Sequence, residues 1–180
     1  MKTVIFKWNP AFSSYSMFRF LEDLRILNEY DESDYNWSVW DYDKIHKGDR
    51  FYWVKVGMYG QVGIAGCGKI TSEPYESEDW SGQGRKTYYV DFIPDTLLNP
   101  DALPILTCDE LKKTIPDFEW NGGHSGLVLT DEQAVILDDL WASFVRRNAK
   151  AFEKAATLDR GDGDLIYSKK FKERNSGVQE

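Results

Sequence analysis

Short runs of β-branched and aromatic residues, separated by turn residues, recur along the chain and are typical of strands. We predict strands at Thr3 to Trp8, Phe51 to Val56, Gln61 to Ser72, Thr87 to Ile93 and Gly126 to Leu129. The aromatic segment Asn36 to Tyr42 is a further candidate. Asn9-Pro10 ends the first run, and Lys47-Gly48-Asp49 is typical of a tight turn before the second. Five or six short strands with bends predict a small curved sheet or barrel.

Three segments carry apolar residues at helical spacing. Ser13 or Ser14 is the expected N-cap of the first. Its apolar positions are Met17, Phe20, Leu21, Leu24 and Leu27. The other two helices begin with the capping boxes Thr107 to Glu110 and Thr130 to Gln133. The last one continues with the apolar stripe Leu137, Leu140, Trp141 and Phe144. Strands combined with peripheral helices predict the α+β class, a small β-barrel with flanking helices.

The apolar periodicity fades after Asn148, and Arg160 to Gly163 is typical of a linker. A chain of 180 residues is long enough for one domain with a sizeable core. We therefore expect one domain over residues 1–148, and a basic, partly helical or mobile C-terminal tail over residues 149–180.

Aromatic residues are the unusual part of the composition. Hydrophobic and charged fractions of 42% and 29% are ordinary, but the chain holds seven Trp, ten Tyr and ten Phe. Packing a small core does not need so many rings, so some are expected to line a surface cleft. No apolar run approaches the length of a membrane span, and the N-terminus does not resemble a secretory signal. We expect a cytoplasmic protein.

Charge is unevenly distributed along the chain. The net charge is −8, but residues 146–174 hold nine basic and five acidic residues, a local charge of +4, so the remainder carries −12. An acidic body disfavours a broad electrostatic contact with duplex phosphates. Recognition of a ligand through one pocket is still compatible with this balance.

Two motifs that commonly carry chemistry have simpler interpretations here. Residues 63–69 fit the phosphate-loop pattern GxxxxGK, but Ile70 follows where Ser or Thr and a helix are required. We expect these glycines to let a strand bend or approach another backbone. Cys67 and Cys108 are isolated, and His46 and His124 lie in no metal-binding pattern, so no disulfide, metal or cofactor is expected.

The segment Asn36 to Tyr42 is the most informative one. If it is extended, Ser38 and Trp40 share one face, whereas Trp37 lies on the other. Flat rings beside short polar groups suit the stacking of a planar heterocycle and hydrogen bonding to its edge. A core aromatic cluster is the alternative. The Gly-rich turn around His124 and Ser125 either supplies donors to a cleft or is a simple loop.

The order of these motifs resembles the EVE domain family of the PUA-like superfamily, which is related to YTH and ASCH domains. The matching segments are Phe6 to Pro10, Ser38 to Tyr42, Gly48 to Trp53, Gly63 to Gly66 with Pro74-Tyr75, Ser125-Gly126 and Thr130 to Gln133. The resemblance covers about Val4 to Phe144. It implies a small β-barrel whose aromatic-lined cleft holds a nucleobase, often a modified one. Position by position, it implies that Trp8, Asn9, Ser38 and Trp40 border the cleft and that His124 and Ser125 close it. Trp37 and Trp120 are further ligand-binding candidates, Trp80 is a candidate lid, and Trp53 and Trp141 are assigned to the core.

Three functions stay open at this point. The first is a non-enzymatic module that binds a modified base in nucleic acid or as a free nucleoside. The second is an ASCH-like hydrolase of an acylated base or nucleoside, for which Lys7 or Lys69 with Asp41 are the candidate groups. The third is an adaptor whose aromatic patch binds a protein.

Overall fold

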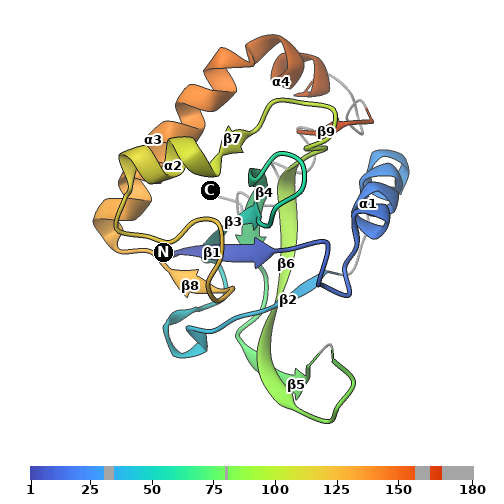
Figure 1. Cartoon of the computed structure of the whole chain (residues 1–180), viewed down its shortest axis with the longest axis vertical. Helices are drawn as coiled ribbons and strands as arrows, with labels where there is room; N and C mark the ends of the chain where they lie inside the picture. Colours follow the sequence, from blue (N-terminus) through green and yellow to red (C-terminus); the bar gives the residue numbers. More distant parts are fainter. Residues whose placement is uncertain (31–34, 80, 157–162, 168–180) are drawn as a thin grey trace.

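A mixed sheet forms the centre of the molecule (Figure 1). The computed structural model describes residues 1–30, 35–79, 81–156 and 163–167. Within these residues, nine strands form one sheet, with the path β2-β6-β4-β3-β1-β8. The path strands are β1 (Thr3–Trp8), β2 (Asn36–Ser38), β3 (Arg50–Lys55), β4 (Gly63–Ile70), β6 (Lys86–Leu98) and β8 (Leu127–Val128). Three more strands lie off the path: β5 (Tyr75–Glu78) and β9 (Leu165–Ile166) pair with β6, and β7 (Leu106–Thr107) pairs with β4.

β1 shows how the alternation in the sequence divides the core. It lies between β3, to which it is parallel, and β8, to which it is antiparallel. Val4, Phe6 and Trp8 enter one buried cluster, whereas Ile5 enters the other. Side chains of a strand point alternately to the two faces of a sheet, so this short strand supplies both halves of the core.

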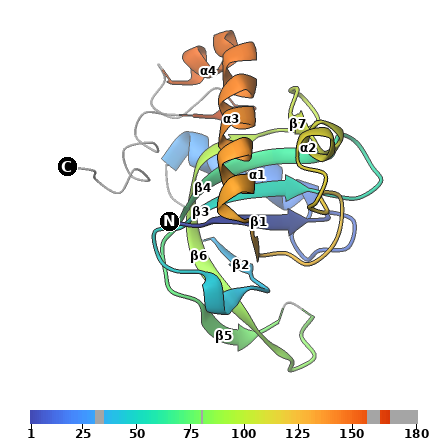
Figure 2. The ribbon, with the colours of Figure 1, turned by 90° about the vertical axis from the view of Figure 1, so that its left-hand side faces the viewer.

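Helices cover both faces of the sheet. They are α1 (Met17–Tyr30), α2 (Cys108–Thr114), α3 (Asp131–Arg147) and α4 (Ala149–Ala156), with the short 3-10 helix η1 (Tyr42–Lys44). α2, α3 and α4 pack on the face of Ile5, and α1 places Phe20 and Leu24 on the face of Phe6 (Figures 1 and 2). None of the described helices combines the length and apolar character of a membrane span. The predicted α+β class is confirmed: six strands form the main path of the sheet, where five to six strands were expected, and helices flank it.

The glycines of β4 are explained by its contact with β6. A Cβ at Gly68 would lie 2.2 Å from the carbonyl oxygen of Ile93, and one at Gly66 would lie 2.8 Å from that of Thr96. The pairing register shifts between Cys67 and Gly68, opposite Pro94. The GxxxxGK match is therefore a bent strand in close backbone contact and not a phosphate loop, as predicted.

The predicted helix starts are confirmed, with one exception. Thr130 and Gln133 form a complete capping box, and Thr107 accepts a hydrogen bond from the Glu110 amide. The predicted cap of α1 is wrong, because Ser16 accepts the hydrogen bond from the Arg19 amide. Ser13 instead accepts one from the Tyr15 amide, and this bond shapes the loop before the helix.

β6 is longer than the sequence predicts. It runs past Ile93 through Pro94, which is tolerated because it lies at the irregularity opposite Gly68. At its other end β6 pairs with β5, and the two strands extend from the body as an arm (Figure 1). This arm flanks the candidate site.

Part of the segment beyond Asn148 packs on the body of the domain. Phe152 and Ala155 of α4 are buried, and Leu165 and Ile166 pair with the end of β6. Asn148 itself marks the junction between α3 and α4. Residues 157–162 and 168–180, like the predicted lid residue Trp80, lie outside the described residues.

Candidate functional site

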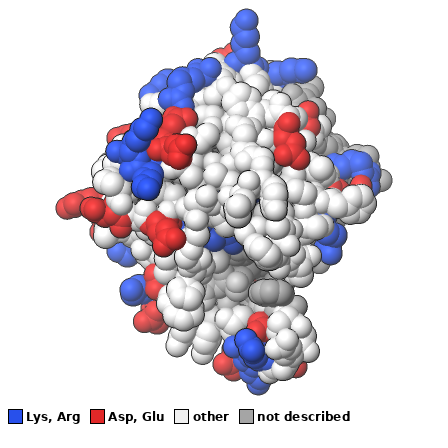
Figure 3. All heavy atoms as spheres, in the orientation of Figure 1, with Lys and Arg blue, Asp and Glu red and all other residues white. Residues whose placement is uncertain are grey.

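A cavity of about 500 Å³ opens between the end of β1, the loop before α1, and β2. Its aromatic lining residues are Phe12, Tyr15, Tyr35, Trp37, Trp53 and Tyr89. The polar ones are Asn9, Ser13, Ser14, Asn36, Ser38 and Ser125, and the charged ones are Lys7, Arg19 and Asp23. Figure 3 shows this face of the molecule hollowed between the body and the β5–β6 arm. Flat rings among short polar groups suit a planar ligand with a polar edge.

Three of the rings form a corner of the pocket, which we call the aromatic corner: Tyr15, Trp37 and Trp53. Tyr15 stands edge-on to Trp37, with centroids 5.9 Å apart and planes at 85°. It stacks on Trp53 at 5.6 Å and 26°, and Trp37 meets Trp53 at 5.1 Å and 65°. Trp53 is fully buried and forms the floor, whereas Trp37 is half-buried and forms a wall. The corner offers rings in two nearly perpendicular orientations.

Hydrogen bonds fix the Trp37 wall. Its indole nitrogen donates to Ser125 Oγ at 3.0 Å and to the Lys7 carbonyl at 3.3 Å. Ser125 Oγ also accepts from the Lys7 amide at 2.9 Å. Among the described residues, no hydrogen bond uses the proton of the Ser125 hydroxyl. This hydroxyl can therefore donate to an acceptor atom of a ligand.

Tyr15 is held by two hydrogen bonds and a cation. Its hydroxyl donates to Asp23 of α1, and its carbonyl accepts from the Trp8 indole. The Arg19 guanidinium lies over the Tyr15 ring, 5.8 Å from its centroid. Burial, together with the neighbouring Tyr35, raises the pKa of Tyr15 above its ordinary value, so the phenol stays neutral. These contacts attach the pocket loop to the start of α1.

The Lys7 side chain anchors the loop that connects α2 to β8. Its amine donates to the carbonyls of Glu119, at 2.8 Å, and Gly122. Burial lowers the pKa of Lys7, and the Glu119 carboxylate partly opposes that shift. Because the same residue binds Ser125 through its backbone, it sets the position of that hydroxyl in the pocket.

The groups suggested for a hydrolase are engaged in structural contacts. The Lys7 amine binds two loop carbonyls. Asp41 accepts the Val128 amide at 2.9 Å and so holds β8. Lys69 does not line the described cavity. Of the three groups suggested, only Lys7 lines the pocket, and its amine is engaged by the two loop carbonyls.

The structure brings together four of the eight predicted ligand-binding residues. Asn9, Trp37, Ser38 and Ser125 line the pocket. Their contact with a ligand remains a prediction.

The other four lie elsewhere. Trp8 is fully buried, since the alternation of β1 turns it into the core, and its placement at the border of the cleft is corrected. Trp120 is buried in the opposite cluster, where it donates to the Ile115 carbonyl and lines a separate cavity of about 550 Å³ beside α2. Trp40 and His124 stack on each other outside the pocket, because β2 ends at Ser38 and the chain turns.

Tyr15, Phe12, Tyr35 and Tyr89 were not expected in the site, and Trp53 was assigned to the core alone. Tyr15 and Phe12 belong to a loop whose only signal is the mixture of Ser and rings after Asn9-Pro10. Within the described residues, no group of three or more His, Cys, Asp or Glu side chains is arranged to hold a metal ion.

Comparison with known proteins identifies similar folds. No family model and no curated protein sequence matches the chain. The solution structure of Rpa0253 from Rhodopseudomonas palustris is similar with a TM-score of 0.50 and 16% identity, over 78% of this chain and 92% of that one. The crystal structure of human THYN1 in complex with DNA containing 5-methylcytosine has a TM-score of 0.48 and 17% identity, over 78% of this chain and 97% of that one. At 16% identity, the similarity to Rpa0253 concerns the fold alone.

Proposed function

We propose that the chain is an EVE-type, PUA-like module that binds a nucleobase, in nucleic acid or as a nucleoside, in the pocket at the aromatic corner. One observation carries the proposal: a wall ring and a floor ring meet beside the Ser125 hydroxyl, whose proton is not donated to any described residue. The order of motifs in the sequence is independent support for the family.

Binding would follow from stacking and edge recognition. A base that leaves its stack enters the pocket and packs against Trp37 or Tyr15, and each such contact contributes about 1–3 kcal/mol. The Trp53 indole nitrogen is buried and has no described hydrogen-bond partner. Because this nitrogen has almost no exposed surface, the Ser125 hydroxyl is the donor that a ligand can reach, and it favours a base edge with a ring nitrogen or carbonyl acceptor. Buried donors left without a partner are costly, so such a base would be selected over one that offers donors.

Titration with a panel of bases tests the proposal. The panel consists of 5-methylcytosine, cytosine, N6-methyladenine and adenine, each as a nucleoside and within an oligonucleotide. The fluorescence of Trp37 and Trp53 is expected to change on binding, because a base would stack against these rings. Trp37→Ala is expected to weaken binding at least tenfold, since it removes the wall of the pocket.

Trp120→Phe is the matched control, because Trp120 is a buried tryptophan that does not line this pocket. It is expected to bind like the wild type. A panel in which no member binds would contradict the proposal. So would a folded Trp37→Ala protein with unchanged affinity.

A further inference from the structure

Four aromatic side chains form two exposed stacks outside the pocket, and we call them the aromatic rim: Trp40, Tyr42, Tyr88 and His124. Trp40 stacks on His124 with centroids 3.7 Å apart and planes at 9°, and Tyr42 stacks on Tyr88 with the same values. Trp40 remains 58% exposed and Tyr42 remains 42% exposed. Each stack therefore covers one face of its outer ring and leaves the other face open to solvent.

The rim is continuous with the pocket through the backbone. The Trp40 amide donates to the Ser125 carbonyl at 2.9 Å, and the Val39 amide donates to the Tyr88 carbonyl at 2.9 Å. Gly126 permits this approach, because a Cβ there would lie 2.3 Å from the Val39 Cα. These bonds place the rim directly beside the mouth of the pocket.

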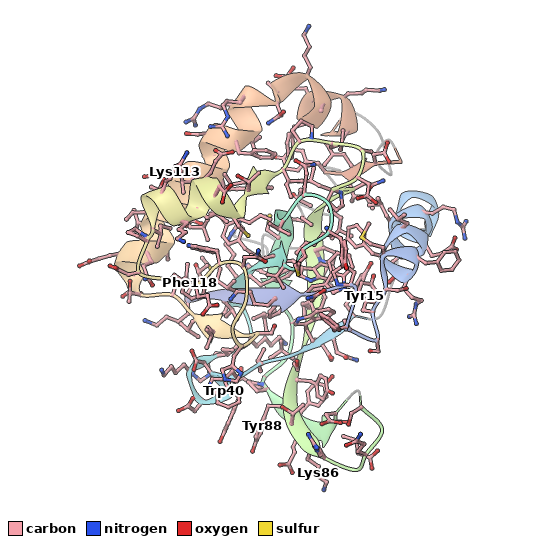
Figure 4. All side chains as sticks on the ribbon, viewed as in Figure 1. Tyr15, Trp40, Lys86, Tyr88, Lys113 and Phe118 are labelled. Atoms are coloured by element: carbon pink, nitrogen blue, oxygen red, sulfur yellow. The ribbon has the colours of Figure 1, made fainter. Side chains whose placement is uncertain are left out.

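The neighbours of the rim residues in the sequence show the same continuity. His124 and Tyr88 immediately precede the pocket residues Ser125 and Tyr89. In Figure 4, Trp40 and Tyr88 lie together on the β2 and β6 side of the molecule, and Tyr15 lies toward α1. The rim thus extends the pocket lining outward on the side away from α1.

We propose that the aromatic rim binds the nucleotides that adjoin the base in the pocket, so that the ligand is a base within a single-stranded segment. This inference rests on the proposed base-binding function. The open faces of flat rings stack on any base, whereas an exposed tryptophan adds nothing to the packing of the core. The four rim side chains carry hydroxyl or ring nitrogen groups at their edges and include no aliphatic residue, which suits nucleotides better than an apolar peptide.

The charges around the rim favour stacking on bases over contacts with phosphates. Lys44 lies beside the rim, but its amine is 4.0 Å from the Asp41 carboxylate, and Asp43 is also adjacent. The chain as a whole carries −8. Lys86 of β6 and Arg19 at the pocket are further cations near the site, so only a few phosphate contacts are expected, and the affinity for a strand would depend only weakly on salt.

The test compares a strand with a nucleoside. The probes are thymidine pentamers with 5-methylcytosine, cytosine, N6-methyladenine or adenine at the centre, and the nucleoside of each central base. The wild type is expected to bind the preferred pentamer at least tenfold more tightly than its nucleoside. Replacing Trp40 and Tyr42 together by Ala is expected to remove that gain and to leave nucleoside binding unchanged. Between 50 and 200 mM salt, the affinity for the pentamer is expected to change less than tenfold.

Tyr59→Ala is the control, because Tyr59 is 75% exposed on the loop between β3 and β4 and belongs to neither the pocket nor the rim. It is expected to bind the pentamer like the wild type. A pentamer that binds no better than the nucleoside would overturn the role of the rim, as would a rim variant that keeps the gain. Binding of a protein through the rim with no effect of the rim variant on the pentamer would also overturn it. Those results leave the pocket intact, whereas failure of every nucleoside and every pentamer refutes the proposed function itself.

Discussion

The two faces of the sheet are built from different side chains. On the face under α2, α3 and α4, the strands contribute mainly aliphatic residues such as Ile5, Val54 and Ile64. On the face toward α1 they contribute rings beside aliphatic residues such as Val4 and Val90. The rings contact one another: the centroids of Phe6 and Phe51 are 4.7 Å apart, and those of Trp8 and Trp53 are 5.4 Å apart.

The difference corresponds to a division of roles. Three helices cover the aliphatic face, whereas α1, its preceding loop and the segment from Tyr35 to Ile45 cover the ring face, from which the pocket opens. Aliphatic side chains interdigitate and fill space between helices and strands. The rings on the other face line the pocket, and their flat faces can stack on a planar ligand. One face therefore mainly stabilises the fold, and the other also provides the candidate site.

The largest expected effect is a loss of stability on the face under α2, α3 and α4. Leu137→Ala removes a fully buried side chain of α3 and is expected to lower the free energy of unfolding by about 2–5 kcal/mol. Denaturant unfolding measures this loss, and ligand affinity per folded molecule is expected to stay unchanged. Val135→Ala, at a 63% exposed position of the same helix, is expected to change stability by about 0.5 kcal/mol at most. Weaker binding by folded Leu137→Ala would show that the two faces are coupled.

An intermediate effect is expected where one residue serves both faces. Lys7→Met leaves the carbonyls of Glu119 and Gly122 without their donor and is expected to cost about 1–3 kcal/mol of stability. Binding is expected to weaken as well, because the loop that carries Ser125 loses its anchor.

Lys2→Met is the matched control for this variant. It breaks only the exposed ion pair of Lys2 with Asp131, so it is expected to cost less than about 1 kcal/mol and to leave binding unchanged. A Lys7→Met protein that loses stability but binds normally would restrict Lys7 to a structural role.

The smallest expected effect concerns the reactivity of the Cys108 thiol, which lies near Lys7. Burial raises the pKa of Cys108 to about 11, although the Lys7 charge opposes the shift. Alkylation of Cys108 in a Cys67→Ser background is therefore expected to accelerate up to about pH 11 instead of levelling near pH 9. Because the unfolded chain ionises first, the contribution of this thiol to stability is lost as the pH rises between these values. A plateau near pH 9 would mean that the thiol is accessible to water.

Local signals in the sequence were enough for most elements of the fold. Thr3 to Trp8 forms a strand with the predicted bounds, because β-branched and aromatic residues precede an Asn-Pro break. The Thr130 capping box and the stripe that buries Leu137 predicted α3. Ile70 in place of a Ser or Thr excluded a phosphate loop, and close contact with β6 explains the glycines.

The lining of the pocket was harder to predict because it depends on where strands end and how loops pack. The family resemblance implied that Trp40 borders the cleft, and alternation put it on the face of Ser38. The strand stops at Ser38, however, and Trp37 lines the pocket instead. Tyr15 is held in the pocket lining by contacts with Asp23 and Trp8, which no local sequence pattern predicts. The continuation of β6 through Pro94 likewise depends on a partner strand distant in sequence.

The position of β1 has a consequence for how the chain folds. β1 is made before both of its neighbours, and its partner Val128 lies near the far end of the domain. Contacts so distant in sequence require a large loop closure and generally slow folding. Until β8 has emerged, the edge of β1 that bears Val4 and Ile5 has no strand to pair with and is open to wrong pairing. The strand that contributes to both faces of the native protein is thus also open to misassembly during synthesis.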